Sequence, residues 1–194
     1  MQTIDQIFQA QIEIKKSTFL SYLCPFKDFK NLLTNLKKEH PKAVHFVYAY
    51  RTLNEYNQII EDKSDDDEPK GTSGIPSLNV LRGYELINTA VITVRYFGGT
   101  KLGTGGLVRA YSDAANAAIN NASLLTFEFK KNIKIAIDFK NLNRFEHFLR
   151  THSLEFERDF KNEKVILNLN LNEEEEQKFE IFCTKFTPFE IEKL

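Results

Sequence analysis

Five of the glycines, at positions 98, 99, 103, 105 and 106, stand close together in a segment that also carries basic and hydroxyl side chains. A strand expected over 90–97 ends before them, and a helix expected from about residue 105 to 121 begins among them. Such an arrangement often binds anions, because the free N–H groups and the positive dipole end of the helix face the ligand. Thr104 can cap this helix. We therefore expect phosphate, a nucleic-acid backbone or an acidic side chain to contact Arg95, Tyr96, Gly98, Gly99, Lys101, Gly103, Thr104, Gly105, Gly106 and Arg109.

This segment is not a standard nucleotide-binding motif. Gly98 and Gly103 have the spacing of a Walker A motif, but Thr104-Gly105 follow where that motif needs Lys and then Ser or Thr. The dinucleotide fingerprint also fails, because Val108 stands three residues after Gly105. A structural alternative is a glycine turn that lets the alanine-rich helix pack closely on the sheet. Spacing alone does not separate the two interpretations.

A second candidate is the acidic run Asp65-Asp66-Asp67-Glu68. Consecutive carboxylates usually form a solvated loop. They could instead hold Mg²⁺ or Ca²⁺, which prefer oxygen ligands, although the run lacks EF-hand spacing and leaves the question of a metal open. A third interpretation pairs the carboxylates with the basic residues above, so that they shape a pocket.

His45 shares one face of an expected strand with Arg51, which is compatible with a polar pocket wall or with a structural histidine. No serine–histidine–acid or cysteine–histidine set can be assembled, so we predict no catalytic residues. We also expect no cofactor. The predicted pocket residues are His45, Arg51, Asp65, Asp66, Glu68, Gly71, Thr72 and Gly74.

All eight glycines lie between Gly71 and Gly106, which concentrates special backbone geometry in one region. The elements that must position this region follow from hydrophobic periodicity. We expect one strand or two short strands over 12–26 and a polar, acidic loop over 53–70. The other predicted elements are a helix over 28–39, a strand over 43–52, a helix over 75–86, the strand over 90–97 and the helix over 105–121.

A second pattern begins near residue 125. Strands are predicted over 129–139, 154–160, 164–171 and 189–194, with helices over 142–152 and 173–186. The order β-α-β-β-α-β is that of a ferredoxin-like domain. The sequence therefore predicts an α+β protein with domains at 1–124 and 125–194.

Composition excludes several classes of protein. The formal net charge of −1 over 194 residues lacks the basic excess of a dedicated nucleic-acid binder, so RNA binding would need a local basic patch. Cys24 and Cys183 form no ligand-spaced pair, which makes a zinc site or disulfide framework unlikely on spacing. The N-terminus lacks the apolar run of a signal peptide, and no window is apolar enough to span a bilayer. We expect a soluble, cytoplasmic protein with no membrane partner.

Several segments resemble the IMPACT family, which includes the YigZ-type bacterial proteins. Smaller matching pieces are Lys15-Lys16-Ser17, His40-Pro41 and Ala49-Tyr50-Arg51. A stronger match is Ser64-Asp65-Asp66 with Glu68-Pro69, followed by Gly71-Thr72 and Gly74. The longest and most specific match is RYFGGTKLGTGGLVRAYSDAA, and the resemblance covers about residues 12–121.

This resemblance implies an N-terminal domain with the fold of the second domain of ribosomal protein S-five. It also implies a ferredoxin-like C-terminal domain similar to the last domain of elongation factor G. Eukaryotic members act in translational control through additional segments that this chain lacks, so their partner does not transfer. Bacterial members have no established reaction, and binding to nucleic acid or the ribosome is the usual inference. The family commonly has Gly at position 67 and a basic residue at position 75, where this chain has Asp67 and Ile75.

Three functions compete. The leading hypothesis is a non-enzymatic, translation-associated protein that recognises RNA, the ribosome or another ribonucleoprotein surface through the segment from Arg95 to Arg109. The alternative is an enzyme that binds a phosphate or nucleotide at the same loop, with Mg²⁺ held by the acidic run. A third possibility is a scaffold that binds a protein partner in translation.

Overall fold

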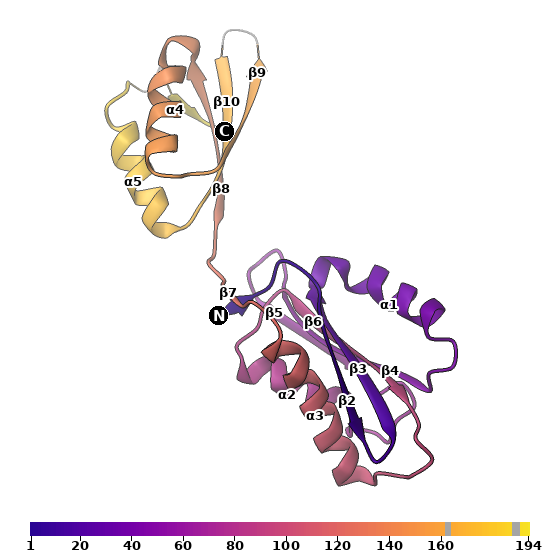
Figure 1. Cartoon of the computed structure of the whole chain (residues 1–194). Coiled ribbons are helices and arrows are strands. Elements are labelled where there is room, and N and C mark those ends of the chain that lie inside the picture. The colour runs from indigo at the N-terminus through magenta and orange to yellow at the C-terminus, as the bar shows by residue number, and fades with distance from the viewer. Residues whose placement is uncertain (162–163, 188–190) are drawn as a thin grey trace. The chain divides into compact units, whose positions relative to one another are not determined.

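A computed structural model describes residues 1–161, 164–187 and 191–194 (Figure 1). Internal contacts divide the chain into two compact units, Met1–Phe127 and Glu128–Leu194. Each unit combines helices with its own antiparallel sheet, which confirms the predicted α+β class. No helix in these ranges is both long and apolar enough to span a membrane.

The N-terminal unit is built on a five-stranded sheet in the order β2-β3-β6-β4-β5, in which every neighbouring pair is antiparallel. The central strand β6 is predominantly β-branched and almost wholly buried, as suits a strand covered on both faces. The strands are β2 (Phe8–Ile14), β3 (Ser17–Pro25), β4 (His45–Leu53), β5 (Ile59–Ser64) and β6 (Thr89–Tyr96).

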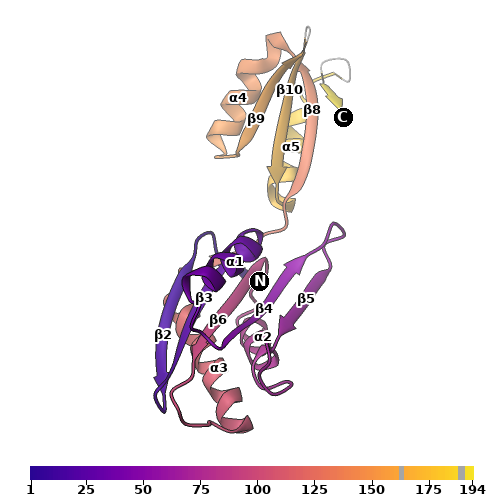
Figure 2. The same ribbon diagram turned by 90° about the vertical axis from the view of Figure 1, so that its right-hand side faces the viewer.

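Helices cover both faces of this sheet (Figures 1 and 2). The helices α2 (Gly74–Gly83) and α3 (Thr104–Asn120) pack on one face, where Val91 and Ala115 share a core cluster. The helix α1 (Phe29–Glu39) packs on the other, where Ile92 belongs to a separate cluster. A short 3₁₀ turn, Phe26–Asp28, leads into α1. Because side chains alternate along a strand, successive residues of β6 contribute to different sides of the unit.

Of two predictions for this unit, one is confirmed in one of its alternatives and one is wrong. The segment 12–26 holds parts of two strands, as the second alternative predicted, and they form a hairpin around Lys15 and Lys16, both at positive φ. The segment 53–70, predicted to be a loop, contains the edge strand β5. Four of its six residues are exposed and three are charged, because β5 lies at the edge of the sheet and is little covered, so no alternation marks it in the sequence.

A small two-stranded sheet, which was not predicted, joins β1 (Gln2–Thr3) to β7 (Leu125–Thr126). Gln2 also bridges to Leu86, which follows α2. The start of the chain is thereby attached to the segment that leaves α3.

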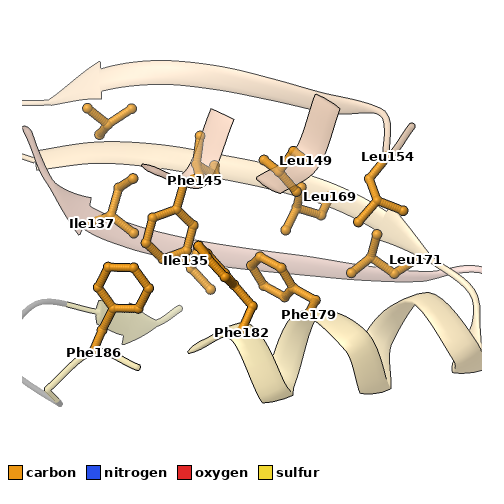
Figure 3. Packing of buried hydrophobic residues seen from close by; sticks show 12 residues of the cluster. Ile135, Ile137, Phe145, Leu149, Leu154, Leu169, Leu171, Phe179, Phe182 and Phe186 are labelled. Atoms are coloured by element: carbon orange, nitrogen blue, oxygen red, sulfur yellow. The ribbon is translucent and has the colours of Figure 1, made fainter. Parts of the chain in front are cut away.

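The C-terminal unit has the predicted β-α-β-β-α-β order, and its sheet runs β11-β8-β10-β9 with all pairs antiparallel. Figure 3 shows its core, in which Phe179 and Phe182 of α5 meet Phe145 of α4. Residues 189 and 190 of the last predicted strand lie outside the described residues. The elements are β8 (Lys131–Asp138), a 3₁₀ turn (Phe139–Asn141), α4 (Leu142–Thr151), β9 (Phe156–Lys161), β10 (Lys164–Leu171), α5 (Glu173–Cys183) and β11 (Ile191–Lys193).

Candidate anion-binding site

A cavity of about 410 Å³ lies in the N-terminal unit where the acidic run, β4 and β6 meet the start of α3. We call it the α3 pocket. Most of its lining comes from the segment 95–107, and the fold brings His45, Glu68 and Pro69 from earlier in the chain against it. The lining residues are His45, Glu68, Pro69, Arg95, Phe97, Lys101, Leu102, Gly103, Thr104 and Leu107.

The floor of the pocket is a buried ion pair between Arg95 and Glu68, whose side chains are 6% and 3% exposed. Nη1 of Arg95 donates to Oε1 of Glu68, and the hydroxyl of Tyr111 donates to the same oxygen at 2.8 Å. Burial, followed by the nearby Glu68 charge, raises the pKa of Tyr111, so its hydroxyl keeps the proton that it donates. Nε of Arg95 is buried and has no hydrogen-bond partner among the described residues.

His45 stands beside this pair. Its Nδ1 lies 2.6 Å from the carbonyl oxygen of Asp66, so Nδ1 carries a hydrogen and donates it. Its Nε2 lies 3.7 Å from Oε1 of Glu68. The hydrogen bond to Asp66 orients the ring and leaves Nε2 as the nitrogen that a neutral His45 presents to Glu68.

The other acidic-run carboxylates hold the loop itself together. Asp65 accepts hydrogen bonds from the amides of Gly71 and Gly74, both at 2.7 Å, and from the Ser73 hydroxyl at 2.7 Å. Burial raises the pKa of Asp65, but these hydrogen bonds outweigh it and hold the pKa below its usual value. Oδ2 of Asp66 accepts from the amide of Phe46 at 2.6 Å.

The contacts of the acidic run bear on the sequence-based interpretations. Glu68 pairs with Arg95, as the interpretation of a shaped pocket predicted. Asp65 and Asp66 instead accept hydrogen bonds from backbone amides. No group of three or more His, Cys, Asp or Glu residues suited to a metal ion occurs within the described ranges. Both carboxylate oxygens of Asp65, Oδ2 of Asp66 and Oε1 of Glu68 already accept hydrogen bonds.

The rim of the pocket is the start of α3. Gly103 precedes the helix with φ 74°, a conformation that side chains other than glycine rarely adopt, and no side chain caps the helix. The prediction that Thr104 caps it is therefore wrong, because Thr104 is already the first helical residue. The first helical bond runs from the Leu107 amide to the Gly103 carbonyl at 2.9 Å. The amides of the preceding turn lie at the exposed end of the helix, beside exposed Lys101.

Gly98 brings the hairpin turn of β2 and β3 against this loop. Its amide donates to the Ser17 hydroxyl at 3.1 Å. A Cβ atom at Gly98 would stand 2.0 Å from the carbonyl carbon of Lys16, so only glycine fits. Exposed Lys15 and Lys16 are consequently held next to the glycine-rich loop.

Some predicted site residues lie elsewhere. Tyr96 faces α1, where its hydroxyl bonds Nδ1 of His40 at 2.9 Å. Arg51 pairs with Glu61 at 2.8 Å, away from the pocket lining. The exposed Arg109 lies further along α3 and does not line the pocket. The glycines at 99, 105 and 106 belong to the loop and the first helical turn, whereas Gly71, Thr72 and Gly74 lead into α2.

Sequence reasoning missed several residues of the pocket. Tyr111 stands seven residues after Thr104, which is two helical turns, so the helical period could have placed both on one face. Leu102 and Leu107 line the cavity but read in sequence as ordinary apolar residues. Pro69, next to Glu68, was also not predicted to line it.

Comparisons with known proteins agree with the long matching run in the sequence. Residues 15–119 match the family described as Impact N-terminal domain. The IMPACT family member YvyE of Bacillus subtilis is 30% identical over 188 residues, covering 95% of this chain and 86% of its own. An IMPACT family member of Thermus thermophilus is 35% identical over 159 residues, covering 81% and 86%.

A solved structure extends the likeness to the whole chain. The structure titled "Crystal structure of an hypothetical protein" matches with a TM-score of 0.71 and 26% sequence identity. The match covers 100% of this chain and 95% of that one, so both units take part in it.

Proposed function

Because this chain belongs to the IMPACT family, we propose that it is a non-enzymatic, translation-associated protein that binds RNA or a ribonucleoprotein surface. The proposed contact is the segment from Arg95 to Arg109, with the ribosome among the possible partners. The predicted likeness of the N-terminal unit to the second domain of ribosomal protein S-five is part of this proposal.

The observation that carries the proposal is the uncapped start of α3 at the mouth of the α3 pocket. The amides of Thr104, Gly105 and Gly106 supply hydrogen-bond donors, and the helix dipole adds about half a positive charge there. Lys101 borders the same cavity. A phosphate group matches this combination of oriented donors and positive charge.

The surrounding charges favour a nucleic acid over an isolated anion. Lys15 and Lys16 are held beside the loop by the close approach at Gly98, and Arg109 is exposed on α3. These three cations and Lys101 together carry more charge than one phosphate needs, while the net charge of the chain is −1. Binding is therefore local and sensitive to salt. Arg95 supports the pocket from below through its pair with Glu68, and its Nε is left without a partner among the described residues.

The enzyme alternative receives less support from the same geometry. It requires Asp65, Asp66 or Glu68 to hold Mg²⁺, and each of these carboxylates already accepts hydrogen bonds within the unit. Nucleotide binding that depends on Mg²⁺ would favour that alternative.

The test is a fluorescence-anisotropy titration of labelled single-stranded RNA at several salt concentrations. We expect binding at low salt, with affinity falling as salt rises. Lys101→Gln should weaken binding and reduce the slope of log affinity against log salt by about 0.7, the contribution of one phosphate contact on a single strand. Lys38→Gln removes the same charge from α1, on the other face of the sheet, and should leave both quantities unchanged. Absence of RNA binding even at low salt would overturn the proposal.

A further inference from the structure

We infer that the α3 pocket takes a terminal phosphate monoester, such as the phosphorylated end of an RNA chain, and not a phosphate within the chain. This inference rests on the proposed function, since it specifies which phosphate of the nucleic acid enters the site. It follows from the depth of the pocket, the charges around it and the apolar character of its rim.

Depth is the first argument. The groups at the floor are almost completely buried: Arg95 is 5% exposed and Glu68 is 7% exposed as whole residues. Phe97, at the rim, is 49% exposed. A phosphodiester continues into a sugar on both sides, so it can lie across the rim but cannot turn inward. A terminal phosphate has one chain connection and can enter end-on.

Charge is the second argument. Arg95 and Glu68 neutralise each other at the floor, which leaves Lys101 and the start of α3 as the net charge of the pocket. Together these amount to about +1.5, because the helix end contributes about half a charge. A phosphate monoester carries about −1.5 to −2 at neutral pH. A diester carries about −1 and leaves part of this positive charge unmatched.

Unused hydrogen-bonding capacity is the third argument, and it is independent of the helix end. Arg95 borders the cavity, is 95% buried by the measure above, and its Nε has no partner among the described residues. A buried donor of a charged group is normally satisfied. A phosphate with three free oxygens can accept from this Nε and from the amides at the start of α3 at once.

The rim explains how the rest of a nucleotide is accommodated. Phe97 offers an exposed ring on which a base can stack, and Leu102 and Leu107 supply an apolar wall. The cavity of about 410 Å³ lies within the size range of small-molecule sites, about 300–1,000 Å³. One terminal nucleotide can therefore occupy the pocket while the remaining chain follows the basic surface near Lys15 and Lys16.

The experiment compares labelled RNA oligonucleotides of one sequence that carry a 5′-phosphate, a 3′-phosphate or hydroxyls at both ends. The full chain is titrated with each by anisotropy. We expect one phosphorylated form to bind at least about tenfold more tightly than the hydroxyl form, as a charge-assisted contact of about 1.4 kcal/mol requires. Whichever end is preferred identifies the source of the monoester.

Two exposed-residue variants keep the test independent of folding. Lys101→Gln should remove most of the preference, and Lys38→Gln should retain it. If all three RNAs bind equally and Lys101→Gln weakens them equally, the inference is overturned while the proposed function stands. If no RNA binds, the proposed function fails as well. A preference that Lys101→Gln leaves intact would place terminal-phosphate recognition outside the α3 pocket and overturn the inference.

Discussion

Glu68→Gln is the most informative single change, because Glu68 holds three other side chains of the floor in place. Its carboxylate accepts from Arg95 and from Tyr111, and His45 lies beside it. Glutamine keeps a carbonyl oxygen for Tyr111 but removes the negative charge. The guanidinium of Arg95 then stays buried without a counter-charge.

The size of the effect follows from the burial of both partners, 6% and 3% exposed at the side chain. Removing one member of such a buried pair costs about 3–5 kcal/mol of unfolding free energy. Domains of this size are stable by only about 5–15 kcal/mol. With a urea slope near 2 kcal/mol per molar, the unfolding midpoint should fall by about 2 M.

The assay uses a spectroscopic property of the chain. All seven tyrosines lie at or before position 111 and there is no tryptophan, so tyrosine fluorescence reports on the N-terminal unit alone. Glu85→Gln is the matched control, since the Glu85 side chain is 76% exposed, and should shift the midpoint little. Adding Arg95→Met to Glu68→Gln should recover part of the loss, because the unpaired charge is gone.

A Glu68→Gln loss below about 0.5 kcal/mol, within the range of surface substitutions, would refute this account of the floor. The same variant also separates anion binding from metal binding. Without the Glu68 charge, a phosphate-bearing ligand should bind more tightly, despite the less stable fold. A magnesium site that used Glu68 would instead lose affinity.

Three further predictions concern other residues of the N-terminal unit. Gly98→Ala should destabilise the N-terminal unit by about 1–3 kcal/mol or more, because the new Cβ would stand 2.0 Å from the carbonyl carbon of Lys16. Gly83→Ala is the control in the same urea assay, since a Cβ at that position would have no atom within 4 Å. Because its pKa is lowered in the folded chain, Asp65 stabilises the fold at pH values at and above its ordinary pKa of 3.8. This stabilisation is lost as the pH falls through the lower pKa of Asp65 in the folded state. In the Asp65→Asn variant, the unfolding free energy should therefore fall less steeply as the pH is lowered into the acid range. Burial raises the pKa of Cys24 to about 12, so in a Cys183→Ser background a thiol reagent should react only after unfolding.

The sequence predicted those elements whose periodicity is strong. The buried strand around Val91 and Ile92 and the helix that follows the glycine loop were found within about a residue of their bounds. The edge strand β5 was missed, because Ile59 and Ile60 are exposed and its charged residues resemble a loop. Periodicity reports burial, and an edge strand has little of it.

The sequence predicted several residues that line the cavity better than it predicted which of them contact one another. Arg95 and Lys101 were predicted to contact an anion and Glu68 to line a pocket, and all three line one cavity. That an anion binds there stays a prediction. The pairing of Arg95 with Glu68, 27 residues apart, depends on which side of β6 faces α3. Tyr96 fell on the opposite side for the same reason. A single sequence does not specify long-range partners, so a basic residue that supports a site looks the same as one that contacts the ligand.

The pairing of β1 with β7 has a consequence for how the N-terminal unit forms. Gln2 and Thr3 pair with Thr126 and Leu125, which lie more than 120 residues later in the chain. The five-stranded sheet can assemble once β6 is available, whereas this last pair closes only after the whole of α3 has followed. Contacts between such distant positions form slowly, and a pair of two-residue strands has little stability of its own. We therefore expect the β1–β7 amides to gain protection last during folding and to exchange first in the native protein.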